Sequence, residues 1–526
     1  MGVAGDIRVE GAKVLYAADS TSRSLTFVTP TEGDVSFGLG VHADLMGGES
    51  PADATSFRIN DIDYRVIENL ADFPGIAGDG GMNGRYVLAA DVDASSISGF
   101  TPVGSAGPQG EAFGGIFRGL GHTVSNLSIQ GASATSRTGF FGATDGASIS
   151  DLTLKNVSVS VGSEMGAIVG SAHDSQIDRV AAVGASVAGG LVTGGLVGVL
   201  DGGRLTQSYA TGTVAGADGA QSAAGGLVGA MRFGAKVSES FSLANVSGTR
   251  AVGGLVGEMM GSSVKPSITD AYASGSVTGT TRVGGLVGSQ GSGSITATYA
   301  NGAVSGSTYV GGLVGWRPAS GTTVSSSYWD TQTTGQTSSA GTGAIGRQSV
   351  FMKLNSGANR FNGFDFTSAA PEWLIYQGFT TPLLTAFLKP LTITSDNITK
   401  PYDGQSSALL NPVYSVAGAD VSGHLFGLST PYGTNKDANT TAVPHYSVTG
   451  IWSDQFGYAV TLKTGTLTIT RRPVDWVVAS KVYNGDAVAT VTGVSGILAE
   501  DESKVRFGTA PTDNLSVSQA LYHDGA

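Results

Sequence analysis

Gly194-Gly195-Leu196-Val197-Gly198 is the first of five identical pentamers that organise the middle of this chain of 526 residues. The other four begin at Gly225, Gly253, Gly284 and Gly311, which gives spacings of 31, 28, 31 and 27 residues. Degenerate copies extend the series upstream at 166–170, 139–142 and 114–117. A repeat of this length is typical of a solenoid, in which each repeat builds one turn and stacks on the next.

The stretches between the pentamers are short, rich in β-forming residues and interrupted by glycine, as in residues 294–300 (SITATYA). One repeat therefore supplies about three short strands and three turns, which is one coil of a right-handed parallel β-helix. Coils stack at roughly 4.8 Å, so eight of them would form a rod section of roughly 38 Å. Glycine suits the corners because it adopts positive φ without a Cβ clash. We predict an all-β fold in which a β-helix is followed by small β domains.

The pentamers define the structural repeat positions of this β-helix. Their Leu-Val pairs are predicted to fill the core, and their glycines to hold equivalent places in every coil. These positions are Gly194, Leu196, Gly226, Leu227, Gly254, Leu255, Gly285, Leu286, Gly312 and Leu313.

An aromatic residue recurs 14 to 18 residues after the second glycine of each pentamer. The five are Tyr209, Phe241, Tyr272, Tyr299 and Tyr328, called the aromatic column below. They could form an exposed platform that stacks on sugar rings, or an internal stack along the coil. Tyr299 shares strand parity with Ile295, an inward position, so we predict the internal stack.

The flanks divide the chain into five predicted parts. These are a β-rich segment at 1–60, the β-helix at 61–345, a capping or junction segment at 346–390, a small β domain at 391–472 and a truncated second copy at 473–526. Large apolar residues at 373–376 and 382–384 are suited to closing an open coil end. The two small domains share Leu-Thr-Ile-Thr, at 391–394 and 467–470, and a turn that begins with Lys400 and Lys481. We assign the first turn to Tyr402, Asp403 and Gly404, because Asp-Gly is a hairpin signal.

Composition excludes several functions. Cysteine is absent, which removes disulfides, cysteine-bound zinc and thiol catalysis. The net charge is −12, which argues against nucleic acid or an anionic membrane surface as a partner. The N-terminus lacks the basic start and apolar stretch of a secretory signal, and no run of about 18 apolar residues occurs. We expect the chain to be a piece of a longer exported protein.

The pentamers resemble the GLUG motif of large bacterial surface exoproteins. Residues 84–95, 117–124 and 328–333 are similar to the same setting, and residues 400–404 resemble the YDG domain, an all-β module. Together they resemble filamentous-haemagglutinin-like adhesins of Gram-negative bacteria, which leave the cell through a partner outer-membrane pore. The resemblance implies a secreted adhesin at the bacterial surface, with a host or bacterial cell-surface glycan or protein as partner. It carries over no catalytic residue and no cofactor.

An enzyme is the main alternative, because β-helices also host polysaccharide lyases and glycosidases. Such enzymes need an acid–base constellation, and the closest Asp pairs are Asp61/Asp63 and Asp91/Asp93. Residues i and i+2 of a strand share a face, so either pair could bind calcium or act on sugar, although solvated charges are the more frequent explanation. No His-Glu-x-x-His and no Gly-x-Ser-x-Gly occurs. We predict that the chain is not an enzyme and holds no metal.

An inert spacer is the second alternative. An adhesin should present a ligand patch, and the residues that lengthen some repeats are expected to emerge as loops on one face. The Thr/Ser/Gly/Gln stretch at 331–343 is one candidate for such a binding loop. A spacer should present none.

Overall fold

The computed structural model describes residues 62–76, 81–104, 111–261, 263–395, 397–403, 423–427, 450–463, 467–473, 475–478, 480 and 491–499. It also describes β1 (Ile7–Val9), β2 (Val14–Leu15), β3 (Ser24–Phe27), β4 (Val35–Phe37), β5 (Ala43–Asp44), β6 (Ser56–Ile59) and β43 (Tyr414–Ser415). The chain forms two compact units, Met1–Leu388 and Lys389–Ala526. The domain boundaries drawn within these units from the sequence stay predictions.

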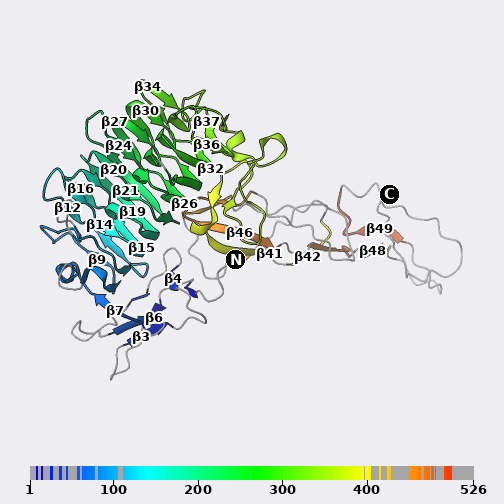
Figure 1. The fold of residues 1–526 in the computed structure, drawn as a ribbon. Coiled ribbons are helices and arrows are strands. Elements are labelled where there is room, and N and C mark those ends of the chain that lie inside the picture. The colour runs from blue at the N-terminus through cyan, green and yellow to red at the C-terminus, as the bar shows by residue number, and fades with distance from the viewer. Residues whose placement is uncertain are drawn as a thin grey trace. The chain divides into compact units, whose positions relative to one another are not determined.

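The first unit contains a parallel β-solenoid of about eight turns, which confirms the predicted all-β fold (Figure 1). One face is a parallel sheet in which each strand begins at the end of a pentamer or of its degenerate copy. Its strands are β14 (Phe141–Asp145), β18 (Val169–His173), β21 (Val197–Asp201), β25 (Val228–Arg232), β28 (Val256–Met259), β31 (Val287–Gln290) and β35 (Val314–Trp316).

The other faces belong to one large sheet whose coil strands pair in parallel with their counterparts one turn away. They are β8 (Arg85–Leu88), β9 (Val92–Asp93), β10 (Ile116–Arg118), β11 (Thr123–Ser125), β12 (Ser128–Gln130), β13 (Arg137–Thr138), β15 (Ser148–Lys155), β16 (Ser158–Ser160), β17 (Glu164–Met165), β19 (Gln176–Ala188), β20 (Val192–Gly194), β22 (Arg204–Thr206), β23 (Tyr209–Ala215), β24 (Ala223–Gly225), β26 (Lys236–Ser242), β27 (Asn245–Gly253), β29 (Ser267–Ala273), β30 (Val277–Gly284), β32 (Gly293–Ala300), β33 (Val304–Ser305), β34 (Thr308–Gly311), β36 (Thr322–Ser325), β37 (Ser327–Asp330) and β38 (Ala344–Arg347).

An aromatic cluster closes the N-terminal end of the solenoid. Strand β7 (Ile62–Ile67) pairs with β8, and two 3₁₀ helices follow it, η2 (Leu70–Gly75) and η3 (Gly81–Asn83). The ring of Phe73 in η2 lies 4.7 Å from Phe140 and 5.8 Å from both Phe100 and Phe117. These rings begin a core that continues through every coil to Trp329.

The pentamer glycines are required by close backbone approach, and none of them adopts φ in the left-handed region. Positive φ occurs at glycines outside the pentamers. A Cβ on Gly254, the second glycine of its pentamer, would lie 2.2 Å from the carbonyl oxygen of Gly285 in the next coil. A Cβ on Gly253 would lie 2.0 Å from the carbonyl oxygen of Val256. Any side chain here would therefore push the coils apart, while the leucine of each pentamer is fully buried.

Residues 331–343 form the last turn of the solenoid and close its C-terminal end. Gly312 donates its amide to the carbonyl of Ser338, and Ala340 donates to that of Val314, both at 2.9 Å. The indole Nε1 of Trp329 donates to the carbonyl of Gln336 at 2.9 Å. These contacts explain the stretch as an end cap, so its interpretation as a binding loop is not supported by its geometry.

The aromatic column is buried, but on the outer side of the coil. Adjacent rings lie parallel from Tyr209 to Tyr299, with centroids 4.8 to 5.0 Å apart and interplanar angles of 0° to 4°. The parity argument fails because Ala297, between Ile295 and Tyr299, adopts φ of 53° and turns the chain. Ile295 and Ala300 therefore belong to the coil interior, and Tyr299 does not.

Residues 348–388, called the lateral segment, cover the aromatic column (yellow-green in Figure 1). Its elements are η4 (Phe351–Lys353), η5 (Gly357–Asn359), β39 (Trp373–Leu374), β40 (Leu383–Leu384) and η6 (Thr385–Phe387). Phe361 contacts Tyr328, Trp373 contacts Tyr299 and Tyr272, and Phe387 contacts Phe241 and Tyr209. The segment thus runs back along the side of the solenoid and does not close an open coil end as expected.

The second unit consists of small sheets. β41 (Lys389–Ser395) pairs in parallel with β46 (Tyr458–Lys463), and β42 (Ile398–Pro401) with β47 (Leu467–Thr470). β44 (Leu425–Phe426) with β45 (Trp452–Ser453), and β48 (Asp475–Val478) with β49 (Val491–Ser495), pair antiparallel. Lys400 forms an ion pair with Asp403 at 2.8 Å, whereas Gly404 and the turn at Lys481 lie outside the described residues. Among the described residues, no helix has the length and apolar character needed to cross a membrane.

Candidate functional site

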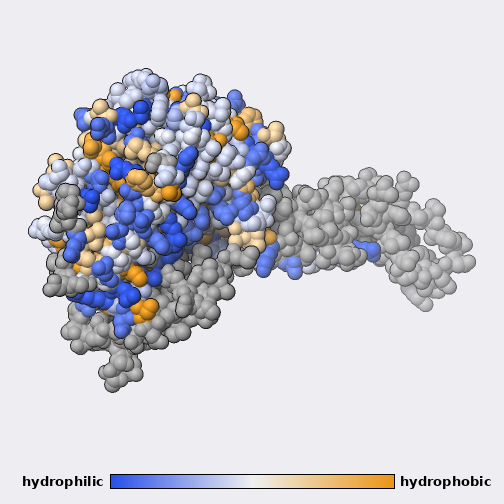
Figure 2. All heavy atoms as spheres, viewed as in Figure 1, coloured by the Kyte–Doolittle hydropathy of each residue, from blue (hydrophilic) through white to orange (hydrophobic). Residues whose placement is uncertain are grey.

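One corner of the solenoid carries a column of polar side chains in left-handed backbone conformation. The corner column consists of Asp151, Arg179, Gln207, Glu239 and Asp270, whose φ angles lie between 45° and 55°. The strand registers place these residues at one position of successive coils. In Figure 2 hydrophilic side chains gather over this face, where Figure 1 shows β15, β19 and β26. Non-glycine residues are uncommon in this conformation, and those that adopt it cluster at functional sites, so the corner column is a candidate site.

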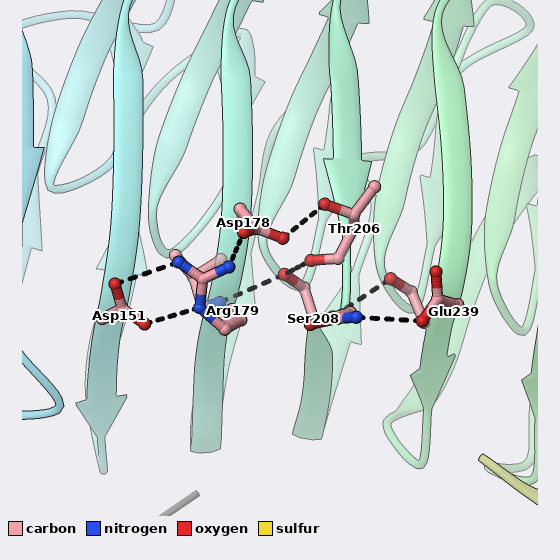
Figure 3. A network of polar contacts seen from close by, with 9 residues as sticks. Asp151, Asp178, Arg179, Thr206, Ser208 and Glu239 are labelled. Carbon is pink, nitrogen blue, oxygen red and sulfur yellow. Dashed lines mark hydrogen bonds and ion pairs between the residues drawn. The ribbon is translucent and has the colours of Figure 1, made fainter. Parts of the chain in front are cut away.

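Two pairs of side chains in the corner column bond between adjacent coils (Figure 3). Arg179 donates to both carboxylate oxygens of Asp151, at 2.7 and 3.2 Å, and also contacts Asp178. Gln207 donates to Glu239 at 2.9 Å. The Asp151 carboxylate is almost fully buried, with 1% of its side chain exposed. The left-handed corner therefore has a structural explanation, because it aligns partners that tie adjacent coils together.

A buried hydroxyl ladder lies directly behind this corner. Ser208 and Ser240 are fully buried, and each accepts a backbone amide from the preceding coil at 3.1 Å, from Val180 and Ser208 respectively. Ser240 in turn donates to the carbonyl of Ser238 at 2.7 Å. The bend interrupts the regular strand pairing, so the hydroxyls supply the partners that the backbone would otherwise lack.

We expect Ser240→Ala to lower the free energy of unfolding by about 1–3 kcal/mol, because it leaves the buried amide of Ser208 without an acceptor. Ser238→Ala, two residues away and partly exposed, is the matched control and should change stability little. Urea denaturation followed by circular dichroism measures both. Equal stability losses in the two variants would contradict the role assigned to the ladder.

Of the two acidic pairs singled out from the sequence, the structure describes both members only of Asp91/Asp93. Asp91 accepts the amide of Thr123 at 2.8 Å and contacts Nδ1 of His122 at 3.2 Å. Asp93 accepts from Asn126 and from the amide of Ser95, and these hydrogen bonds lower its pKa. Asp63 is exposed and Asp61 lies outside the described residues. Both carboxylates of the 91/93 pair are thus engaged in holding neighbouring turns.

A second carboxylate group, missed by the sequence reasoning, lies where the lateral segment meets the coils. Burial raises the pKa of Asp270, which accepts from Nε1 of Trp373 at 2.8 Å. Burial also raises the pKa of Glu372, while hydrogen bonds from Ser368 and Thr367 lower that of Asp365 to about 2. No local motif indicates this group, because Asp270 lies about a hundred residues before Asp365 and Glu372 and meets them only when the lateral segment folds back. In the described part of the chain, no cluster of His, Asp and Glu is arranged to hold a metal ion.

His173, at the neighbouring corner, forms a hydrogen bond with Asp145. The hydrogen bond to Asp145, at 2.8 Å, raises the pKa of His173, with Asp174 and Asp201 adding to the effect. Burial raises the pKa of Asp201 in turn. In the folded protein, both groups therefore retain their protons to a higher pH than usual.

We expect the stability difference between wild type and His173→Gln to depend on pH. A raised folded-state pKa gives a contribution that is complete below the ordinary value of 6.5 and is lost as pH rises through the folded-state pKa. Thermal melts of both proteins across this range measure it, with Gln176→Asn, an exposed neighbour, as the non-titrating control. Because His173 is exposed, the effect should be small, and a difference that grew with rising pH would contradict the assignment.

The loops that lengthen two repeats leave the solenoid at different corners. The extra residues of one repeat lie between β23 and β24, in residues 216–222, just before a pentamer. Those of another lie between β28 and β29, in residues 260–266, just after the sheet that follows a pentamer. The expectation of loops on one face is therefore wrong. The second loop places Val264, 59% exposed, against Gly234, next to the exposed Phe233.

A surface patch combines two arginines, a glutamate and two aromatic rings. This arginine–aromatic patch consists of Arg250, Glu258, Arg282, Tyr309 and Trp316. The guanidinium of Arg282 lies 4.2 Å from the centre of the Trp316 ring and 4.0 Å from Glu258, and Arg250 contacts Glu258 at 3.4 Å. Tyr309 is 58% exposed.

A sequence signal for the patch exists. Glu258 and Trp316 each follow a pentamer directly, and Arg282 and Tyr309 each lie two residues before one. Equivalent positions stack along the solenoid, so residues just outside the pentamers come together even though they are distant in sequence.

Comparison with known proteins finds similarity to a curated protein and to solved structures. No family model matches the chain. Halomucin from Haloquadratum walsbyi is 30% identical over 539 aligned positions, which cover 88% of this chain but only 5% of halomucin. A crystal structure of a candidate immunoglobulin A1 protease from Bacteroides ovatus aligns with a TM-score of 0.36 and 20% identity, over 55% of this chain and 85% of that one. The chain thus corresponds to about one twentieth of the halomucin length. It carries a β-solenoid in which pairs of polar side chains join adjacent coils at one corner.

Proposed function

We propose that this chain is a rod section of a secreted bacterial surface protein and mediates attachment through the side faces of its solenoid. The observation that supports this most directly is the continuous core from Phe73 to Trp329. Packed side chains fill the interior, so ligands are left to the outer surface. A lateral segment that spans the coils from Tyr328 to Tyr209 adds stiffness along the same axis.

The resemblance to filamentous-haemagglutinin-like adhesins supports the same proposal. It suggests an extracellular location, export through a partner pore in the outer membrane, and a cell-surface glycan or protein as ligand. The similarity to halomucin over most of the chain is compatible with a section of a much longer protein. Weak binding at each site would be amplified by many copies on one cell.

The test uses the whole chain coupled at high density to fluorescent beads. We expect the beads to attach to host cells, and soluble whole chain in excess to compete. Beads that carry variants with substitutions in the second unit, for example at Asp403, should attach as well as beads that carry the wild type. If folded, densely coupled chain attaches to no cell type, the adhesive function is wrong and the inert spacer becomes the better account.

We further propose that the chain is not an enzyme. Its carboxylates at 91 and 93 hold turns, and Asp270 is bonded to Trp373. Incubation with acidic and neutral polysaccharides should release no new reducing or unsaturated ends. Turnover that disappeared in Asp270→Asn, while the variant kept its circular dichroism spectrum, would establish a glycosidase or lyase instead.

A further inference from the structure

The arginine–aromatic patch lies where two columns of the solenoid meet. Glu258, Ser289 and Trp316 are register partners in β28, β31 and β35. Arg282 and Tyr309 hold the left-handed corner of the neighbouring strands, with φ of 57° and 56°. In the coils just before the patch the same two columns carry Val192, Val199, Ala223, Ala230 and Ala251, which pack into a small apolar cluster. The apolar cluster therefore ends where the charged and aromatic side chains of the patch begin.

The charges of the patch do not balance. Arg250 and Arg282 share the single carboxylate of Glu258, and their side chains are 21% and 25% exposed. Burial and the neighbouring Arg250 both lower the pKa of Arg282, whereas Glu258 raises it. Two guanidiniums on one carboxylate leave an excess positive charge in a chain whose net charge is −12. An additional anion would relieve the repulsion between them.

The guanidinium of Arg282 is held in place for such an anion. It lies over the Trp316 ring and donates to the hydroxyl of Ser289 at 3.4 Å. A stacked guanidinium loses little conformational entropy when it forms a bidentate pair with a carboxylate. The exposed ring of Tyr309 stands at the adjacent corner position and offers an apolar face with a polar rim.

We propose that the arginine–aromatic patch binds the carboxylate-bearing sugar rings of an acidic polysaccharide. A uronic acid presents its carboxylate on a rigid ring, so the anion meets the two guanidiniums while an apolar ring face lies against Tyr309. An inorganic anion lacks the apolar face, and an acidic protein side chain would have to be immobilised at an entropic cost. The inference rests on the proposed adhesive function and assigns a site and a ligand class to it.

The test is titration calorimetry of the whole chain with an oligomer of galacturonic acid, and with its methyl ester as the uncharged counterpart. We expect the acid to bind and the ester to bind at least tenfold more weakly. Arg282→Gln and Arg250→Gln should each weaken binding of the acid roughly tenfold or more, since each removes a charged hydrogen-bond donor. Arg204→Gln, which removes an exposed arginine from β22, is the matched control and should bind like wild type.

Tyr309→Ala keeps the proposal testable if an arginine variant fails to fold, because Tyr309 is exposed and its loss should weaken binding without unfolding the chain. The proposal is overturned if the acid does not bind wild type, if the ester binds equally well, or if Tyr309→Ala binds unchanged. Bead attachment separates the two levels of the inference. If beads that carry Arg282→Gln still attach, the adhesive function stands but its site lies elsewhere on the chain. If their attachment is lost, and the acid does not compete with wild-type attachment, the patch binds a protein ligand.

Discussion

Val256→Asp is expected to lower the free energy of unfolding by roughly 3 to 5 kcal/mol, because it places an uncompensated carboxylate in the interior of the solenoid. Val256 is fully buried and lies between its register partners Val228 and Val287 in the coils on either side. Each coil is stabilised mainly by its two neighbours, so one defect weakens two interfaces. Urea denaturation followed by circular dichroism measures the loss.

Thr278→Asp is the matched control for this substitution. Thr278 is exposed in β30, so the same carboxylate there remains in water and should change stability little. The deficit of Val256→Asp should also shrink as the pH falls, because the neutral carboxylic acid costs less to bury than its anion. If Val256→Asp lost no more unfolding free energy than Thr278→Asp, or if its loss did not depend on pH, the side chain at position 256 would reach solvent.

The glycines of the pentamer are required for a steric reason that the repeat pattern in the sequence does not show. The spacing of the repeats is enough to predict stacked turns, and the buried leucine of each pentamer follows from that geometry. The role of the glycines could not be deduced from one strand. A Cβ on Gly254 would clash with Gly285, a residue of the next turn, so the constraint exists only after the coils have stacked.

Side-chain direction was harder to predict than fold class. Alternation along a strand holds only while the backbone stays extended, and one left-handed residue reverses it. In β32 that residue is Ala297. Its identity does not predict a turn, because alanine is not expected at positive φ. The same position is filled by Asp151, Arg179 and Glu239 in other coils, so the corner is imposed by the solenoid and not by local preference.

The arginine–aromatic patch and the lateral segment illustrate two kinds of long-range contact. The patch could have been found, since Arg282 and Trp316 hold fixed offsets from successive pentamers and equivalent offsets stack. The lateral segment could not, because nothing in residues 348–388 repeats. The lateral segment is related to the aromatic column only by its large apolar side chains, which cover the column. This relation can be predicted only if the column is known to face outward.

Trp373→Ala is expected to detach the lateral segment from the coils and to cost about 3–5 kcal/mol, the usual range for removal of a buried tryptophan. Trp373 is fully buried, with its ring 6.0 Å from Tyr299, 6.4 Å from Tyr272 and 4.7 Å from Phe364. Its loss also removes the indole donor from Asp270, whose pKa burial already raises. We therefore expect trypsin to cleave after Lys353 and Arg360 faster than in wild type.

Two further variants separate packing from hydrogen bonding in this prediction. Trp373→Phe keeps a ring against the aromatic column but loses the Nε1 donor, so it should recover most of the protease resistance and leave the pKa of Asp270 higher than in wild type. Phe379→Ala removes an aromatic ring of the same segment that is 44% exposed and should cleave like wild type. If Trp373→Ala were cleaved no faster than Phe379→Ala, the lateral segment would be held by its backbone pairing and not by the aromatic column, and the column would need another explanation for its burial.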